Sequence, residues 1–324
     1  MAEVHLREGG LCGPAATADR QTAVKVLIIA GIVAVNSVWI AISDFGFDTV
    51  SGVKAFATAA VLAAVAWFYR VRRPIEKFEA LCTETALLLA FSASAATFSY
   101  LMTSINLPLV DKQLLSVDAA LGFDWIGYVG FVNARPWLGA IFSAVYVTTL
   151  AQVALTVLIL GMTGNLERMR HFVSAVMLGA LICIVVSAIL PSAGALGTLR
   201  PPADFLAMNQ PIVDLDYKQV FFDLRSGAER FISLDALHGL IAFPSYHCTL
   251  SALIVIAFIG SGSWFWPVLV LNLAVILSTP VDGGHHLSDA IGGVLVALAS
   301  WALVALVSRQ SAVQAAEAAV EFSE

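Results

Sequence analysis

The chain has 324 residues, of which 59% are hydrophobic and only 12% are charged, and its mean hydropathy is +0.87. Soluble domains carry about 25% charged residues, so this composition excludes an ordinary soluble protein and indicates an integral membrane protein. A net charge of -6 without a basic stripe excludes a nucleic-acid partner. The four cysteines lie too far apart to indicate a metal site or a disulfide framework; they are Cys12, Cys82, Cys183 and Cys248.

Eight apolar runs follow one another along the chain. A bilayer core requires about 20 apolar residues per helix, because lipid offers the backbone no hydrogen-bond partner. The sixth and seventh runs are short. We predict an all-α, polytopic bundle of about eight transmembrane helices. The runs cover residues 24–42, 53–68, 81–102, 138–160, 172–190, 248–259, 264–277 and 287–307.

The chain divides into three parts on this pattern. Residues 1–80 form an N-terminal segment with two transmembrane helices, residues 81–307 a membrane core, and residues 308–324 a cytoplasmic tail. The first run has no A-x-A-like site after it, so we expect an uncleaved anchor. Between the third and fourth runs, residues 108–131 mix leucines and aspartates at three- to four-residue spacing. This pattern fits a helix lying in the membrane interface or an ordinary surface helix, but not a ninth span.

Basic residues in short loops predict the orientation, because such residues stay on the cytoplasmic side. They follow the second and fourth helices, whereas aspartates dominate after the first and third. We therefore expect both termini in the cytoplasm, and the 53 residues 191–243 outside or in the periplasm of a plasma (inner) membrane. The basic residues are Arg70, Arg72, Arg73, Lys77, Arg168 and Arg170.

Two histidine motifs stand at the ends of apolar runs. PSYHCTL, with His247, opens the sixth helix, and VDGGHHLSDAIGG, with His285 and His286, opens the eighth. The sixth and seventh helices form a hairpin with a brief turn at residues 260–263. A chain that leaves one membrane face at His247 therefore returns to it at His285, so both motifs should meet on one side.

The spacing of His285 and Asp289 predicts a catalytic pair. They stand i, i+4 on one helical face, so the carboxylate can accept a hydrogen bond from one ring nitrogen and orient the other. An imidazole held in this way can attack phosphorus and form a phosphohistidine. His247 can then protonate the leaving oxygen, because histidine exchanges protons near neutral pH.

Four neighbouring features could bind the phosphate. Gly283 and Gly284 would leave room for it beside the free N–H groups that open the last helix, and Ser245 could donate a hydroxyl. His286 stands i, i+3 from Asp289 and is the alternative to His285, or a further substrate contact.

These residues resemble the type 2 phosphatidic acid phosphatase superfamily, which is related to vanadium haloperoxidases. PSYH matches the second signature motif at Pro244, Ser245 and His247, and the third motif fits Ser278, His285 and Asp289. The HHxxD pattern, the long outer loop and DAALGFDW look more like the inositol phosphorylceramide synthase branch. The resemblance covers residues 81–307 and implies a six-helix core with His285 as nucleophile, Asp289 as its orienter and His247 as acid.

Two basic positions of the family pattern are missing. The third-motif arginine falls at Thr279 and the first-motif lysine at Ala193, although Arg200 and Pro201 match the end of the first motif. Arg200 is therefore the expected phosphate ligand, since guanidinium binds phosphate oxygens bidentately. Alternative or additional cations from the same loop are Lys218, Arg225 and Arg230.

The sequence favours a membrane enzyme that cleaves a phosphoester of a phospholipid or a polyprenyl phosphate, without metal or cofactor, at the outer membrane face. If water is the acceptor, the protein is a phosphatase. If a lipid hydroxyl is the acceptor, it is a head-group transferase that delivers phosphoinositol or a similar group to ceramide or diacylglycerol. A non-catalytic scaffold or a transporter is the hypothesis from another class.

Overall fold

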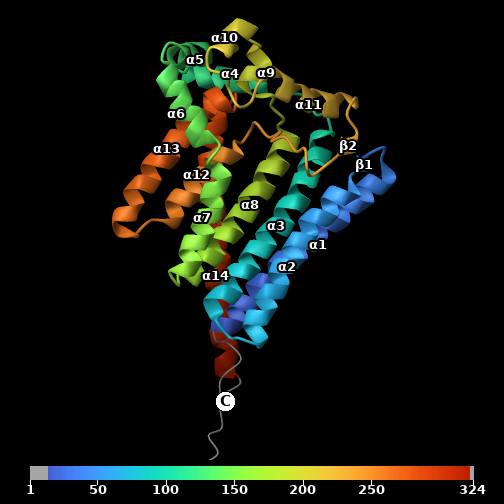
Figure 1. Cartoon of the computed structure of the whole chain (residues 1–324), viewed down its shortest axis with the longest axis vertical. Coiled ribbons are helices and arrows are strands. Elements are labelled where there is room, and N and C mark those ends of the chain that lie inside the picture. Colours follow the sequence, from blue (N-terminus) through green and yellow to red (C-terminus); the bar gives the residue numbers. More distant parts are fainter. Residues whose placement is uncertain (1–13, 322–324) are drawn as a thin grey trace, which may run out of the picture.

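The computed structural model describes residues 14–321, and within them the chain is almost entirely helical (Figure 1). Cys12 lies outside the described residues. Six helices are long and apolar enough to cross a membrane, which confirms the prediction of a polytopic helical bundle. They are α1 (Pro14–Ile42), α2 (Thr49–Val71), α3 (Glu76–Thr103), α8 (Leu166–Ile189), α13 (Phe265–Asp282) and α14 (Leu287–Glu321). The last helix continues through most of the expected tail.

The remaining two predicted spans also correspond to helices, but neither is a long straight one. The predicted fourth span forms α6 (Pro136–Tyr146) and α7 (Thr149–Met162), which are bent by 48°. At the break, the hydroxyl groups of Thr148 and Thr149 donate to the carbonyl oxygens of Val145 and Tyr146. Such side-chain bonds compete with the helical ladder and favour a bend. The predicted sixth span is the 12-residue helix α12 (Tyr246–Ala257), followed by the 3₁₀ turn η1 (Gly262–Trp264).

The segment expected at the interface forms α4 (Asp111–Ala120) and α5 (Trp125–Asn133), which lie across one end of the bundle (Figure 1). The two helices are bent by 75° relative to each other. The Trp125 indole N–H donates to the carbonyl of Pro280 at 2.9 Å, and this bond ties α5 to α13.

The long outer connection covers the same end of the bundle (Figure 1). It folds into α9 (Gly194–Leu199), α10 (Ala203–Ala207) and α11 (Leu215–Ser226). A two-residue parallel strand pair, which the sequence did not predict, links β1 (Gly46–Phe47) to β2 (Phe231–Ile232). The outer connection is therefore attached both to the α1–α2 turn and to the main bundle.

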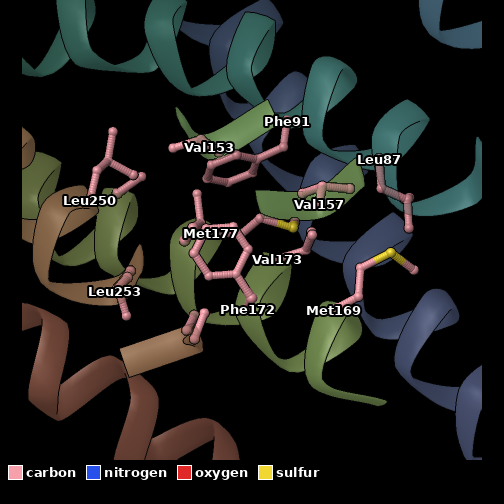
Figure 2. Close-up of a cluster of buried hydrophobic side chains, with 14 of the residues drawn as sticks. Leu87, Phe91, Val153, Val157, Met169, Phe172, Val173, Met177, Leu250 and Leu253 are labelled. Carbon is pink, nitrogen blue, oxygen red and sulfur yellow. The ribbon is translucent and has the colours of Figure 1, made fainter. Parts of the chain in front are cut away.

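The core of the bundle lies where α3, α7, α8 and α12 meet (Figure 2). Phe172 and Met169 of α8 are fully buried there, next to Phe91 of α3 and Leu253 of α12. Within a bilayer, helices associate by close packing rather than by leaving water, so these contacts fix the place of the short helix α12. The start of α12, which carries His247, is positioned by them.

A buried ion pair joins α1 to α3. The Lys25 Nζ lies 2.5 Å from the Glu84 Oε2, and both side chains are almost completely buried. Charged groups within membrane helices are costly unless they are paired, so each residue stabilises the other in place.

We expect the Lys25→Met variant to lose about 3–5 kcal/mol of unfolding free energy, because Glu84 is left buried without a partner. The double variant Lys25→Met, Glu84→Leu should recover most of this loss, since it removes both charges. Equilibrium unfolding in detergent micelles measures the difference. Equal destabilisation of the single and double variants would contradict this interpretation.

Candidate active site

The two histidine motifs meet at the end of the bundle that α4, α9 and α11 cover. Ser245 begins α12, where its hydroxyl accepts the backbone N–H of Cys248. Its own N–H donates to the carbonyl oxygen of Asp289 on α14 at 3.0 Å. The Ser245 hydroxyl also lies 3.3 Å from the Nε2 of His285. The expectation that the hairpin returns the chain to the same face agrees with these contacts.

His285 and Asp289 form the pair that their spacing predicted. The His285 Nδ1 lies 3.2 Å from the Asp289 Oδ2, and the same oxygen accepts the backbone N–H of His286 at 2.9 Å. Because the carboxylate can only accept, Nδ1 carries the proton and Nε2 keeps its lone pair. The Ser245 hydroxyl can donate to that lone pair. The ring is thus oriented with its basic nitrogen toward Ser245.

The two glycines before His285 serve close packing. A Cβ on Gly283 would lie 2.6 Å from the His285 Cδ2, so any side chain there would displace the imidazole. Gly284 has a φ of +64°, and a Cβ on it would lie 2.6 Å from the Cβ of Leu196 on α9. The space beside Gly284, where we expected a phosphate, is therefore occupied by α9.

His247 is held by an aromatic partner that sequence reasoning missed. Its ring stacks on Tyr146, with ring centroids 4.3 Å apart and an interplanar angle of 16°. The Tyr146 hydroxyl lies 3.4 Å from the Nδ1 of His247. Tyr146 is the last residue of α6, so the bend between α6 and α7 places it. A contact across 101 residues leaves no local signal in the sequence.

A cavity of about 400 Å³ is lined by both His247 and His285. His247, Gly283 and His285 line it together with Lys218 and Tyr217 of α11. The rest of its wall is mostly apolar and comes from α3, α7, α8, α12 and the outer connection; it includes Phe91, Ala95, Leu150, Ile184, Leu240 and Leu250. The cavity therefore has a polar end at the histidines and an apolar end between the helices.

The structure does not bring His286 into this cavity. Its Nε2 lies 3.3 Å from the Asp111 Oδ1 and its Nδ1 lies 3.4 Å from the Asp118 Oδ2, so the ring faces α4. Burial alone would lower the pKa of His286, but the hydrogen bond with Asp111 and the charges of Asp289, Asp111 and Asp118 outweigh it, and the pKa is raised. His286 thus lies between two carboxylates that favour its protonated form, which does not fit the expected contact with substrate.

Asp111 and Asp118 of α4 accept hydrogen bonds from residues that adjoin the site. Asp118 accepts the first backbone N–H groups of α14, from Leu287 and Ser288, at 3.0 and 2.9 Å. Asp111 accepts the Ser192 hydroxyl and the backbone N–H of Ala193. A carboxylate at a helix N-terminus satisfies free N–H groups and complements the helix dipole. Their seven-residue spacing, two turns on one helical face, was the signal in the sequence.

The expected phosphate ligand Arg200 lies outside the cavity. It ends α9, its Nε donates to the carbonyl of Gly197 at 3.2 Å, and its guanidinium lies 5.0 Å from the centre of the Phe222 ring. Arg225 donates to the carbonyl of Leu107, and Arg230 lies over the ring of Phe45. Of the four loop cations that we considered, the cavity is lined by Lys218 alone.

Comparison with known proteins identifies one family. A family model described as the PAP2 superfamily matches residues 112–303, a stretch that contains His247, His285 and Asp289. No curated protein and no solved structure matched the chain.

We expect the His286→Gln variant to lose about 3–5 kcal/mol of stability at pH 6, because it leaves two buried carboxylates without their cation. The folded-state pKa of His286 is raised, so its contribution is fully present below about pH 6.5, the usual value of the free side chain, and is lost as pH rises through the folded-state pKa. Thermal unfolding in detergent between pH 5 and pH 9 measures this. A difference between wild type and variant that grows with pH would contradict it.

Proposed function

The chain belongs to the PAP2 superfamily, and we propose that it cleaves a lipid phosphoester by covalent catalysis, with His285 as nucleophile and His247 as general acid. Membership supports a phosphatase-type phosphoesterase activity. The observation that carries the finer proposal is the geometry of His285. Asp289 binds its Nδ1, and His285 lines the same cavity as His247.

In the first step, the Nε2 lone pair attacks phosphorus and the bond from phosphorus to the leaving oxygen breaks. His247 gives a proton to that oxygen, and the Asp289 carboxylate stabilises the positive ring of His285 through Nδ1–H. The Ser245 hydroxyl, released from Nε2, can donate to a phosphoryl oxygen. In the second step, an acceptor O–H attacks phosphorus, His247 takes its proton, and the phosphorus–nitrogen bond breaks. Both histidines return to their starting states.

The walls of the cavity favour a lipid as the substrate. Beyond the histidines they are mostly apolar, and many of the apolar side chains lie on α3, α7, α8 and α12 of the helical bundle. Such a wall suits the chain of a phospholipid or a polyprenyl phosphate, while the phosphate lies at the polar end. A water-soluble phosphoester would leave this apolar surface without a partner.

We place the site at the exterior or periplasmic face of the membrane. The end of α2, the turn between α2 and α3 and the start of α8 lie at the opposite end of the bundle (Figure 1). They carry Arg70, Arg72, Arg73, Arg168 and Arg170. Basic loops remain in the cytoplasm, so the histidines would face the other side.

Transfer of a head group to a lipid hydroxyl is the second candidate. Both reactions use the same nucleophile and the same acid, and they differ only in the second-step acceptor. The observation that favours transfer is the loss of basic residues at Thr279 and Ala193, both of which are buried. In the inositol phosphorylceramide synthase branch, which the sequence resembles, the first and third motifs are more divergent. The two changes therefore count less against a transferase than against a plain phosphatase.

We expect the His285→Ala variant to lower turnover by at least about 1,000-fold and His247→Asn by about 100- to 10,000-fold, the usual contribution of acid–base catalysis. The matched control is His171→Gln, because His171 lies on α8 and bonds to the carbonyl of Trp301, away from the cavity. Mass spectrometry of products from phosphatidic acid, polyprenyl diphosphate and phosphatidylinositol, each with and without ceramide, provides the measurement.

Histidine-dependent release of inorganic phosphate, unaffected by ceramide, indicates a phosphatase. A new phospholipid that forms only with ceramide indicates a transferase. If the His285→Ala protein keeps ordinary turnover, the covalent mechanism is wrong, and absence of any product from the folded wild type favours the scaffold hypothesis.

A further inference from the structure

A second cavity lies toward the end of the bundle opposite the histidines. It is a groove of about 310 Å³ between α1, α8 and α14. The start of α1 and the far end of α14 both lie at this end (Figure 1). The groove shares no lining residue with the cavity of His247 and His285, so the proposed catalysis gives it no role.

Each of the three helices contributes one face to this groove. The lining residues of each helix stand three or four positions apart, a spacing that places them on the same side of a helix. The floor comes from α8, where Met177 is buried and Leu181 is half-buried. Val24 of α1 and Val307 of α14 form the rims and are exposed. The groove therefore opens along the outside of the bundle, where lipid surrounds a membrane protein.

The groove is polar at one end and apolar along its length. Arg20 and Gln21, near the start of α1, lie at the polar end. The lining farther into the bundle includes Ile28, Leu181 and Leu303, which are all apolar. Helix α1 runs from the polar end into the bundle, so Ile28 lies two turns, or about 12 Å, beyond Arg20. This gradient matches a ligand with a polar head and a long apolar chain.

Arg20 is the cation that the groove offers to such a head. It is exposed, and among the side chains described in residues 18–310 it forms no ion pair. Lys25 also lines the groove, but its ammonium group is paired with Glu84. The lining contains no acidic residue, and the neighbouring Asp19 is paired with Arg70. A negative group at this end would therefore meet Arg20 without competition from a carboxylate of the lining.

These features favour an anionic phospholipid over a zwitterionic one. A zwitterionic head group brings its own cation to its phosphate, whereas an anionic one needs a cation from the protein. Arg309 directly follows Ser308 of the lining and adds positive charge at the same end. Basic pockets between membrane helices on the cytoplasmic side bind anionic head groups, and the orientation proposed above places this end in the cytoplasm.

We infer that this groove binds an anionic phospholipid of the cytoplasmic leaflet, with its phosphate at Arg20 and one acyl chain between α1, α8 and α14. The volume of about 310 Å³ is at the lower end of the range for ligand pockets, which suits one chain rather than a whole lipid. Helix α1 precedes residues 112–303, which match the family model, so the matched segment alone does not form the groove. The bound chain would fill the space that separates α1 from α8 and α14.

The test is native mass spectrometry of the full-length protein in detergent, titrated with dioleoylphosphatidylglycerol or with dioleoylphosphatidylcholine. Two variants alter the groove: Arg20→Gln removes the charge, and Val307→Trp fills the apolar part. Arg73→Gln is the control for charge, because Arg73 is an exposed arginine at the same end of the bundle and does not line the groove. Leu306→Trp is the control for bulk, because Leu306 is an exposed residue of α14 that also does not line it.

We expect one phosphatidylglycerol molecule to bind the wild type with a Kd at least about 5-fold lower than that of phosphatidylcholine, the effect of a single cation near an anionic lipid. Arg20→Gln should remove most of this preference, and Val307→Trp should remove the bound molecule for both lipids. The two controls should change each Kd less than about 2-fold. A phospholipid in the cavity of His247 and His285 would remain in every variant, because the groove and that cavity share no lining residue.

Melting temperatures of the same proteins show whether each variant is folded. Equal affinity of the wild type for the two lipids would overturn the inference, and so would a preference for phosphatidylglycerol that persists in a folded Arg20→Gln protein. If Val307→Trp instead abolishes a dimer and leaves lipid binding unchanged, the groove is a contact between two copies of the chain and the inference is wrong. The result is independent of the proposed catalysis, since loss of His285-dependent turnover would leave lipid binding in the groove unchanged.

Discussion

The hydrogen bond between Asp289 and His285 is the interaction on which the candidate site depends. The Asp289 carboxylate accepts hydrogen bonds from the Nδ1 of His285 and from the backbone N–H of His286. Its backbone carbonyl accepts a hydrogen bond from the N–H of Ser245. One residue thus orients His285, the proposed nucleophile, binds the turn before α14 and attaches the start of α12. Because Asp289 is completely buried, water cannot compete for these bonds.

Two buried carboxylates of α4, next to the site, stabilise this arrangement. Asp111 and Asp118 of α4 lie beside the ring of His286, and Asp118 accepts the first N–H groups of α14. These carboxylates use their lone pairs for structure, and within residues 14–321 neither of them forms an ion pair with Lys218, which lines the cavity.

Much of this could be read from the sequence, and the rest depends on contacts between distant segments. The apolar runs predicted each membrane helix because length and hydropathy are local properties of the sequence. The spacing of His285 and Asp289 predicted their contact because the geometry of an α-helix is fixed. Arg200 was chosen from a motif position, yet its guanidinium packs on Phe222. Tyr146 and Lys218 reach the cavity through the bend after α6 and the fold of α11, and neither feature has a local pattern that places it there.

The most direct test of the central claim is to trap the covalent intermediate. Wild-type protein is mixed with a phospholipid substrate, quenched in alkali, which preserves phosphohistidine, and digested for mass spectrometry. The account predicts phosphate, or the transferred phospho-head group, on His285 within one turnover, and none on the neighbouring His286. A label on any other residue, or turnover without a labelled histidine at every quench time, would contradict it.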